Sequence, residues 1–199
     1  PQSIRRQLRV GEFTTSVDLA DAYLHIPVDR AFQRFLRIAV QGQVWQFRAM
    51  PFGLNIAPRT FTNLLSPVAS FLRARGIRIH RYLDGDWLIL AESVQESLHH
   101  TDQVLQLFDS LGLLVWREKS DLVPRKAFVF LGVHFNLATG LVAPPSAKIL
   151  GVVQLVHSIL PQSRIRLRLL LRLIGILNHV ADYVRLGRLH LRPIQFYLL

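Results

Sequence analysis

Three aspartates in apolar surroundings are the residues of this sequence best suited to chemistry. Asp18 ends one apolar run, and Asp84 and Asp86 stand at a turn between two others. Ionised carboxylates are costly in such surroundings unless they bind something. Carboxylates brought together from two strand ends make a hard-oxygen site suited to Mg²⁺. Two such ions about 3.5–4 Å apart can hold the attacking and the leaving oxygen of an in-line phosphoryl transfer.

The same three residues also have a simpler interpretation, because Asp is a common turn former and a common helix N-cap. Other chemistries are excluded more firmly. The chain has no cysteine, which excludes disulfides, a thiolate zinc site and a cysteine nucleophile. This composition fits a reducing intracellular compartment, either cytoplasmic or nuclear.

The 199-residue chain is strongly basic, and half of its residues are hydrophobic. Its formal net charge is +11, from 24 Lys and Arg against 13 Asp and Glu, which indicates a polyanionic partner. Residues 1–10 carry +3 and residues 161–199 carry +6, so the middle of the chain is nearly neutral. Two interpretations stay open: the arginines track phosphates, or their stems cover solvated helix faces.

The elements that position the aspartates alternate between strands and helices, and the last third of the chain is helical. The pattern therefore predicts an α+β body followed by a helical C-terminal subdomain. Ser93 and Glu96 match a capping box at a helix start. The longest uncharged stretch, 127–147, contains Gly, Pro and Asn, so we expect no membrane span. We expect strands at 14–19, 34–40, 44–48, 77–83, 87–91, 113–116 and 127–135, and helices at 59–75, 93–110, 146–160 and 163–185.

Five motifs between residues 13 and 135 resemble, in the same order, the catalytic motifs of reverse transcriptases. They are SVDLADAYLHIP at 16–27, AMPFGLNIAPRTF at 49–61, YLDGD at 82–86, GLLVWREKS at 112–120 and FLG at 130–132. On these motifs the chain is identified as a member of the reverse transcriptase (RNA-directed DNA polymerase) family. GRLHLRP at 187–193, together with the residues around YLDGD, is most similar to DIRS-type retrotransposons, which are relatives of LTR retroelements.

The resemblance implies a right-hand polymerase fold. Residues 1–143 would form the palm, an antiparallel sheet with packed helices, with a remnant of the fingers. Residues 144–199 would form a helical thumb-like or connection-like region. Little chain precedes the first motif, so we expect the fingers to be largely missing.

The resemblance also implies RNA- and DNA-templated DNA synthesis by nucleotidyl transfer. The cofactor would be two Mg²⁺ ions, with Mn²⁺ as an alternative. The expected partners are an RNA or DNA template with its primer, deoxynucleoside triphosphates, and the rest of a retroelement polyprotein, including a ribonuclease H domain. No membrane partner is expected.

The family's site residues can be carried over where the motifs match. Tyr23 would be the steric gate against a ribose 2′-hydroxyl, although a core aromatic would fit the same position. Lys119 would contact the pyrophosphate, although a solvated lysine is equally compatible. The resemblance implies catalytic Asp18, Asp84 and Asp86, metal ligands Asp18, Leu19 (carbonyl), Asp84 and Asp86, nucleotide contacts Tyr23, Phe52, Gly53 and Lys119, and nucleic-acid contacts Arg59, Arg164, Arg166, Arg168 and Arg172.

Gly85 departs from the family's Tyr-x-Asp-Asp box, because it separates Asp84 from Asp86. An extra residue at a hairpin turn can reverse the facing of all that follows. Absorbed as a bulge, it would instead leave Asp84 and Trp87 each in register with its strand. Asp84 keeps the family's spacing from Tyr82, which favours it over Asp86. The alternative function is a non-catalytic nucleic-acid-binding relic or domesticated module; a generic metal-dependent nuclease leaves four of the five motifs unexplained.

Overall fold

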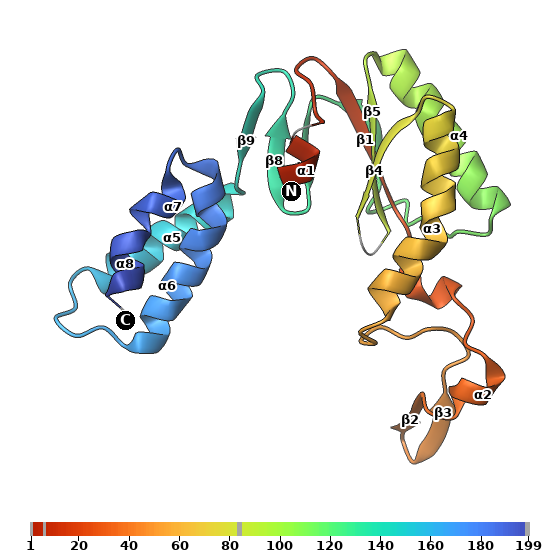
Figure 1. Ribbon diagram of the computed structural model, residues 1–199, viewed down its shortest axis with the longest axis horizontal. Coiled ribbons are helices and arrows are strands. Elements are labelled where there is room, and N and C mark those ends of the chain that lie inside the picture. Colours follow the sequence, from red (N-terminus) through yellow and green to blue (C-terminus); the bar gives the residue numbers. More distant parts are fainter. Residues whose placement is uncertain (1, 6, 83–84, 198–199) are drawn as a thin grey trace. The chain divides into compact units, whose positions relative to one another are not determined.

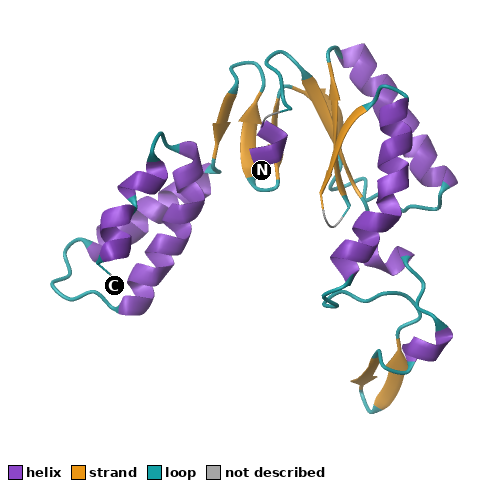
Figure 2. Cartoon of the chain, in the orientation of Figure 1, coloured by secondary structure: helices purple, strands orange, loops and turns teal. Residues whose placement is uncertain are grey.

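The computed structural model describes residues 2–5, 7–82 and 85–197, which form two compact units (Figure 1). The first unit is Gln2–Lys126, and the second holds the described residues from Ala127 onward. Each unit contains its own antiparallel sheet and its own helices (Figure 2). The division falls between residues 126 and 127, so the strands after that point belong with the C-terminal helices.

The first unit is built on a four-stranded sheet with strand order β4-β5-β1-β6. Neighbouring strands are antiparallel throughout, and β1 therefore lies between strands that come from much later in the chain. The elements are α1 (Gln2–Arg5), β1 (Phe13–Asp18), the 3₁₀ helix η1 (Ala22–His25), α2 (Arg30–Gln33), β2 (Arg37–Val40), β3 (Gln43–Gln46), α3 (Ala57–Ala74), β4 (Arg78–Tyr82), β5 (Asp86–Ala91), α4 (Val94–Ser110) and β6 (Asp121–Arg125).

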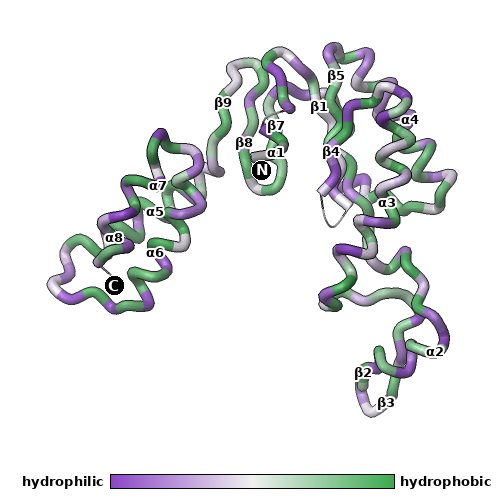
Figure 3. The backbone as a smooth tube through the Cα atoms, in the orientation of Figure 1, coloured by the Kyte–Doolittle hydropathy of each residue, from purple (hydrophilic) through white to green (hydrophobic). Residues whose placement is uncertain are grey.

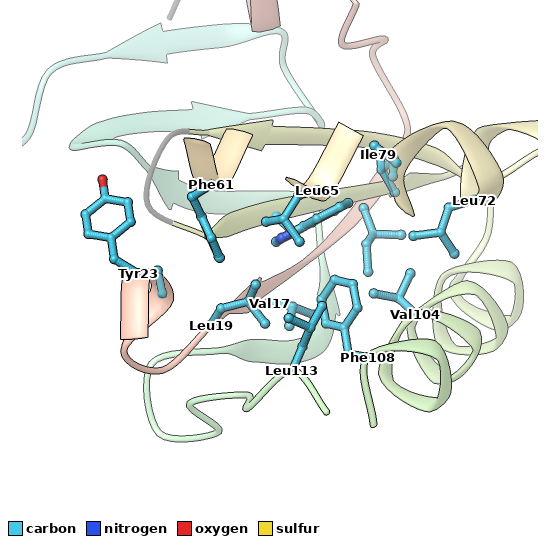
Figure 4. Packing of buried hydrophobic residues seen from close by; sticks show 14 of the residues in the cluster. Val17, Leu19, Tyr23, Phe61, Leu65, Leu72, Ile79, Val104, Phe108 and Leu113 are labelled. Atoms are coloured by element: carbon cyan, nitrogen blue, oxygen red, sulfur yellow. The ribbon is translucent and has the colours of Figure 1, made fainter. Parts of the chain in front are cut away.

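Helices α3 and α4 cover one face of this sheet, and the core lies between them and the strands (Figure 4). Buried positions in α3 recur at helical spacing, as at Phe61, Leu65 and Leu72. They pack with Val17 and Trp87, which are paired across β1 and β5. Each buried side chain of this size contributes about 1.5–3 kcal/mol, so this layer fixes the end of β1 where Asp18 stands.

The hairpin β2–β3 extends away from the sheet of its own unit (Figure 1). Its loop, Gln41 and Gly42, has two positive φ angles, 51° and 76°, as two-residue hairpins require. All residues of both strands are exposed, although they include the apolar side chains of Val40, Val44 and Trp45. Figure 3 shows the hydropathy along the hairpin. The described chain therefore leaves both faces of this hairpin uncovered.

The second unit joins a three-stranded sheet, order β7-β8-β9, to a group of helices. Its buried residues include Val133 and Phe135 in the sheet and Leu170 and Leu173 in α6. The elements are β7 (Ala127–Phe130), β8 (Val133–Asn136), β9 (Leu141–Ala143), α5 (Ser146–Ile159), α6 (Leu167–Val180), the 3₁₀ helix η2 (Ala181–Tyr183), α7 (Gly187–His190) and α8 (Arg192–Phe196).

Some expected elements differ from those observed. Residues 113–116 form a single bridge, Leu19 with Val115, and not a strand. The expected strand 127–135 is two strands, because Leu131 and Gly132 form a turn with φ of 51° and 69°. The last long helix begins at Leu167 instead of residue 163 and ends at Val180. The elements not expected from the sequence include strands β6 and β9, the short helices α1, α2, α7 and α8, and the 3₁₀ helix η1.

Candidate active site

Asp18 and Asp86 lie directly opposite each other at the ends of the central strands β1 and β5. Asp86 is also the partner of Tyr82 on β4, so three neighbouring strands meet here. Side chains directly opposite in an antiparallel pair have Cβ atoms about 4.5–5.5 Å apart. The next pair inward, Val17 and Trp87, is buried in the core beneath the helices. Since facing alternates along a strand, both carboxylates belong to the face opposite the helices.

The main chain around Asp18 is held from two directions. The Asp18 N–H donates to Ser120 Oγ at 3.0 Å, and the Asp18 carbonyl accepts from the Trp116 N–H at 2.8 Å. The Leu19 N–H donates to the Gly85 carbonyl at 3.2 Å. Across the described ranges, neither the Asp18 carboxylate nor the Leu19 carbonyl has a hydrogen-bond partner or ion pair. Both oxygens are therefore available to a ligand.

Gly85 adopts a conformation that favours glycine, with φ of +102°. Its N–H donates to the Tyr82 carbonyl at 3.1 Å. A Cβ placed on it would lie 2.8 Å from the Cβ of Leu19, closer than two such atoms normally approach. Asp86 follows Gly85 and is paired with both Tyr82 and Asp18. The predicted catalytic Asp84 lies outside the described residues.

The donor set at this end of the sheet suits a hard divalent cation, because it consists of carboxylate and carbonyl oxygens. Within 2–5, 7–82 and 85–197, no group of three or more His, Asp or Glu side chains is close enough to hold a metal ion. The described part of the predicted set is Asp18, Asp86 and the Leu19 carbonyl.

The predicted steric gate, Tyr23, lies in η1 and is 5% exposed. Its ring centroid is 4.9 Å from that of Phe52 and 5.8 Å from that of Phe61. Figure 4 shows Tyr23 and Phe61 in the buried cluster. Phe52 is 58% exposed. Gly53 has φ of +94° and open space where a Cβ would be. An exposed aromatic and an open glycine thus lie beside the buried ring of Tyr23.

Two predicted basic contacts of the first unit lie near these segments. The Lys119 Nζ is 3.5 Å from the centroid of the Trp116 ring, a cation–π contact. Because Trp116 bonds the Asp18 carbonyl, Lys119 belongs to the loop that braces the end of β1. Arg59 is exposed in the first turn of α3, six residues after Gly53.

The predicted nucleic-acid contacts of the second unit gather at the start of α6. Arg166, Arg168 and Arg172 line an open hollow of about 590 Å³, together with Gln162 and Leu169. Arg164 is exposed but is not among the residues that line the hollow. Three guanidinium groups around one hollow form a strongly positive site with fork-shaped donors.

His80 stands on β4 two residues before Tyr82, so it shares the sheet face of the carboxylates. Burial, and then the positive charges of Arg73 and Arg78, lower the pKa of His80 below its usual value of 6.5. The unfolded chain therefore binds more protons than the folded chain at pH values just below 6.5.

We expect acidification through the range just below pH 6.5 to destabilise the fold, and His80→Gln to remove part of that loss. The folded state is not penalised by His80 above the pKa that this histidine has in the unfolded chain. Its stability then declines as the pH falls toward the lower pKa of His80 in the folded protein. Urea unfolding of both proteins over this range would measure the difference. A matched control is His157→Gln, an exposed histidine on α5. Equal pH slopes for unmodified protein and His80→Gln would contradict the expectation.

Two residues of the site were not singled out from the sequence. Ser120 holds the Asp18 N–H, and His25 accepts the Leu114 N–H through Nε2 at 2.9 Å. Neither Ser120 nor His25 gives a local signal in the sequence. Each acts through a hydrogen bond to a segment about a hundred residues away.

The family model described as "Reverse transcriptase (RNA-dependent DNA polymerase)" matches residues 2–135, about two thirds of the chain. The chain belongs to the reverse transcriptase family. The family prediction from the sequence is confirmed, and with it the assignment to the RNA-directed DNA polymerases. The DIRS-type subclass stays a prediction.

Among similar proteins, an uncharacterized protein of Caenorhabditis elegans is 30% identical over 122 residues, 61% of this chain and 9% of its own length. The genome polyprotein of Petunia vein clearing virus is 24% identical over 151 residues, 76% of this chain and 6% of the polyprotein. Protein P of a duck hepatitis B virus is 26% identical over 137 residues, 67% of this chain and 17% of that protein. The chain thus spans less than a fifth of the length of each of these relatives.

Solved structures confirm the predicted fold class of a reverse transcriptase. The foamy viral protease–reverse transcriptase in complex with double-stranded DNA matches with a TM-score of 0.79 and 20% identity, over 94% of this chain and 31% of that one. The same viral protein in complex with an RNA/DNA hybrid matches with a TM-score of 0.76 and 21% identity, over 94% of this chain and 24% of that one. No helix in the described part of the chain is long and apolar enough to span a bilayer.

Proposed function

We propose that this chain carries the polymerase site of a reverse transcriptase and extends a primer with deoxynucleotides on an RNA or DNA template. The observation that supports this most is the pairing of Asp18 with Asp86 at the ends of β1 and β5. Like charges directly opposite in a sheet are destabilising. A cation bound between the two carboxylates would offset this repulsion, which is consistent with a metal site at this end of the sheet.

The proposed metal site consists of Asp18, Asp84 and Asp86 with the carbonyl of Leu19. Two Mg²⁺ ions held there, or Mn²⁺ in their place, would supply Lewis acidity at the primer 3′-hydroxyl and at the leaving pyrophosphate. The chain's own contribution is positioning. Ser120 and Trp116 hold the main chain of Asp18, and Gly85 holds that of Leu19, so the oxygens are oriented before a ligand arrives.

The proposed nucleotide site lies along Tyr23, Phe52 and Gly53, with Lys119 toward the phosphates. Tyr23 acts as a steric gate because its ring is packed between Phe52 and Phe61 and cannot easily move aside for a 2′-hydroxyl. Gly53 presents backbone without a side chain, which permits close approach of a ligand. Lys119 is oriented by the ring of Trp116.

Arginines of each unit are proposed, unit by unit, as contacts to the template–primer. Arg59 would contact it from the first unit, and Arg164, Arg166, Arg168 and Arg172 from the second. These groups contact phosphates and carry no sequence information. The foamy viral relatives were solved with double-stranded DNA and with an RNA/DNA hybrid, which supports a duplex as the partner here. All three relatives are much longer than this chain, and the one from Petunia vein clearing virus is a polyprotein. This supports a polyprotein context for the chain, and we propose that the polyprotein includes a ribonuclease H domain.

Replacing Arg168 and Arg172 with Gln is expected to weaken duplex binding equally for all sequences. Each lost phosphate contact lowers the slope of log affinity against log salt concentration by about 1. Fluorescence anisotropy of a labelled duplex at several salt concentrations would measure it. The control is Arg188→Gln in the same unit, because Arg188 is already paired with Asp182. An unchanged slope in the double variant would contradict the assignment.

Primer extension tests the proposed function as a whole. A DNA primer annealed to an RNA template should be extended in the presence of Mg²⁺ and deoxynucleotides, and Asp18→Asn should not support extension. If neither protein extends the primer while salt-sensitive duplex binding persists, the chain is a non-catalytic nucleic-acid-binding module. The arginine-lined hollow at the start of α6 is the observation that favours this second function.

A further inference from the structure

His25 joins two segments of the candidate site that are far apart in the sequence. Its Nε2 lies 2.9 Å from the Leu114 main-chain nitrogen, and its Nδ1 lies 3.1 Å from the Ala22 carbonyl oxygen. A main-chain N–H can only donate and a carbonyl can only accept. Nε2 must therefore carry the lone pair and Nδ1 the proton. The two contacts together select one neutral tautomer of the ring.

Both ends of this bridge lead to residues of the proposed polymerase site. Ala22 directly precedes Tyr23 in η1. On the other side, the Leu114 carbonyl accepts from the Ala20 N–H at 2.8 Å, and the Trp116 N–H donates to the Asp18 carbonyl at 2.8 Å. The ring of His25 thus fastens the helix that carries Tyr23 to the segment that also braces Asp18.

The short helix η1 needs such a support. It has four residues and is entered through Asp21, whose φ of 50° is left-handed and strained for a residue with a side chain. A single helical turn has no stability of its own, because nucleation is unfavourable. Phe61 contributes packing, with its ring centroid 5.8 Å from Tyr23 and 6.5 Å from His25. Among the hydrogen bonds given for the described residues, the one from the Leu114 N–H to His25 Nε2 ties this helix to the 114–116 segment in a fixed direction.

We propose that His25 is a positioning residue. In its neutral, Nδ1-protonated form it fixes η1, and with it Tyr23, against the 114–116 segment, which is hydrogen-bonded to Asp18. Its effect on nucleotide selection rests on the proposed function. The two hydrogen bonds do not, so they can be tested without catalysis.

Two substitutions separate the two bonds. His25→Gln places an amide oxygen near the position of Nε2 and keeps the acceptor for Leu114. His25→Asn places an amide nitrogen near the position of Nδ1 and keeps the donor to Ala22, but does not reach Leu114. We expect the Leu114 amide to exchange hydrogen roughly 3- to 10-fold faster in His25→Asn than in His25→Gln. The control is His99→Gln, an exposed histidine of α4.

Nitrogen-15 spectra of the unmodified protein report the tautomer directly. An Nδ1-protonated ring at mildly alkaline pH is the expected result. An Nε2-protonated ring, or equal exchange of Leu114 in the Gln and Asn variants, would overturn the proposal.

If the chain extends primers, His25→Asn should raise the KM for deoxynucleotides and lower discrimination against ribonucleotides by a few-fold, with kcat changed less. His25→Gln should recover part of this loss. A fall in kcat with unchanged KM and discrimination would overturn the link to Tyr23. If no protein extends primers, the proposed function fails, while the tautomer and exchange results still decide the role of the ring.

Discussion

Replacing Asp18 with Asn is expected to abolish primer extension and to leave the fold intact. Asn has nearly the same shape and keeps the main-chain bonds to Ser120 and Trp116. It removes the charge that would hold a divalent cation against Asp86. Loss of one metal-binding carboxylate removes several kcal/mol of transition-state stabilisation, so the rate should fall by about 10³-fold or more.

The matched control is Asp21→Asn. It changes charge by the same amount three residues later, on an exposed side chain with no cap hydrogen bond. Extension by this variant should stay within about twofold of the unmodified protein, since the Asp21 side chain is exposed and its charge is screened by water and salt. Comparable losses in both variants would show that net charge, and not the carboxylate of Asp18, limits the reaction.

Thermal unfolding gives a second measurement that needs no catalysis. Without metal, Asp18→Asn should be as stable as the unmodified chain or up to about 1 kcal/mol more stable, because a like-charge pair with Asp86 is removed. Mg²⁺ should raise the unfolding temperature of the unmodified chain by mass action and should have little effect on the variant. Equal stabilisation by Mg²⁺ in both proteins would place its binding site elsewhere.

The parts of the fold that the sequence predicted well are those with local signals. The strand expected at 14–19 is β1 at Phe13–Asp18, and the helix expected at 93–110 is α4 at Val94–Ser110. Ser93 caps α4 as expected, since its Oγ accepts from the Glu96 N–H at 3.1 Å. Apolar periodicity and a capping side chain act within a few residues, so the sequence alone contains them.

The parts that differ depend on distant partners. Residues 113–116 are apolar, but only Val115 bridges to Leu19, because β1 ends at Asp18 and offers no longer edge. The break in 127–135 requires a left-handed leucine, Leu131, which local preferences disfavour. The hydrophobic pattern predicts that a segment is extended, but it does not predict where the neighbouring strand of the sheet ends.

The candidate site shows the same division. The motif resemblance assigned Asp18 and Asp86 to one predicted site, and the strand register of the structure places them opposite each other. The motifs could not predict the hydrogen bonds of Ser120 and His25, because these join residues that are 102 and 89 positions apart. On α6, helical spacing explains why Arg168 and Arg172 share one hollow. Arg164 precedes that helix and does not line the hollow, which no periodicity could show.

Gly85→Ala is expected to destabilise the first unit by about 3 kcal/mol and to abolish extension. The added Cβ would lie 2.8 Å from the Cβ of Leu19, and the φ of +102° disfavours any side chain. Strained backbone and overpacking each cost about 1–3 kcal/mol. Urea unfolding followed by far-ultraviolet circular dichroism would measure the loss, and primer extension would measure the effect on the site.

Gly76→Ala is the control for backbone strain alone. Gly76 has φ of +81°, stands in the turn before β4, and has open space where a Cβ would be. It should cost only about 1–2 kcal/mol. The excess cost of Gly85→Ala over Gly76→Ala therefore isolates the contact with Leu19. Equal losses in the two variants would mean that Leu19 yields and that the close approach is unimportant.

Deleting Gly85 distinguishes an accommodated residue from a damaging one. The deletion restores the family's Tyr-x-Asp-Asp spacing but removes the carbonyl that accepts from the Leu19 N–H and the N–H that donates to Tyr82. Because Gly85 already places Asp86 opposite Asp18 and satisfies both bonds, the deletion should lower extension. Higher extension after deletion would show that the extra residue impairs the site, and that the observed register is not the reactive one.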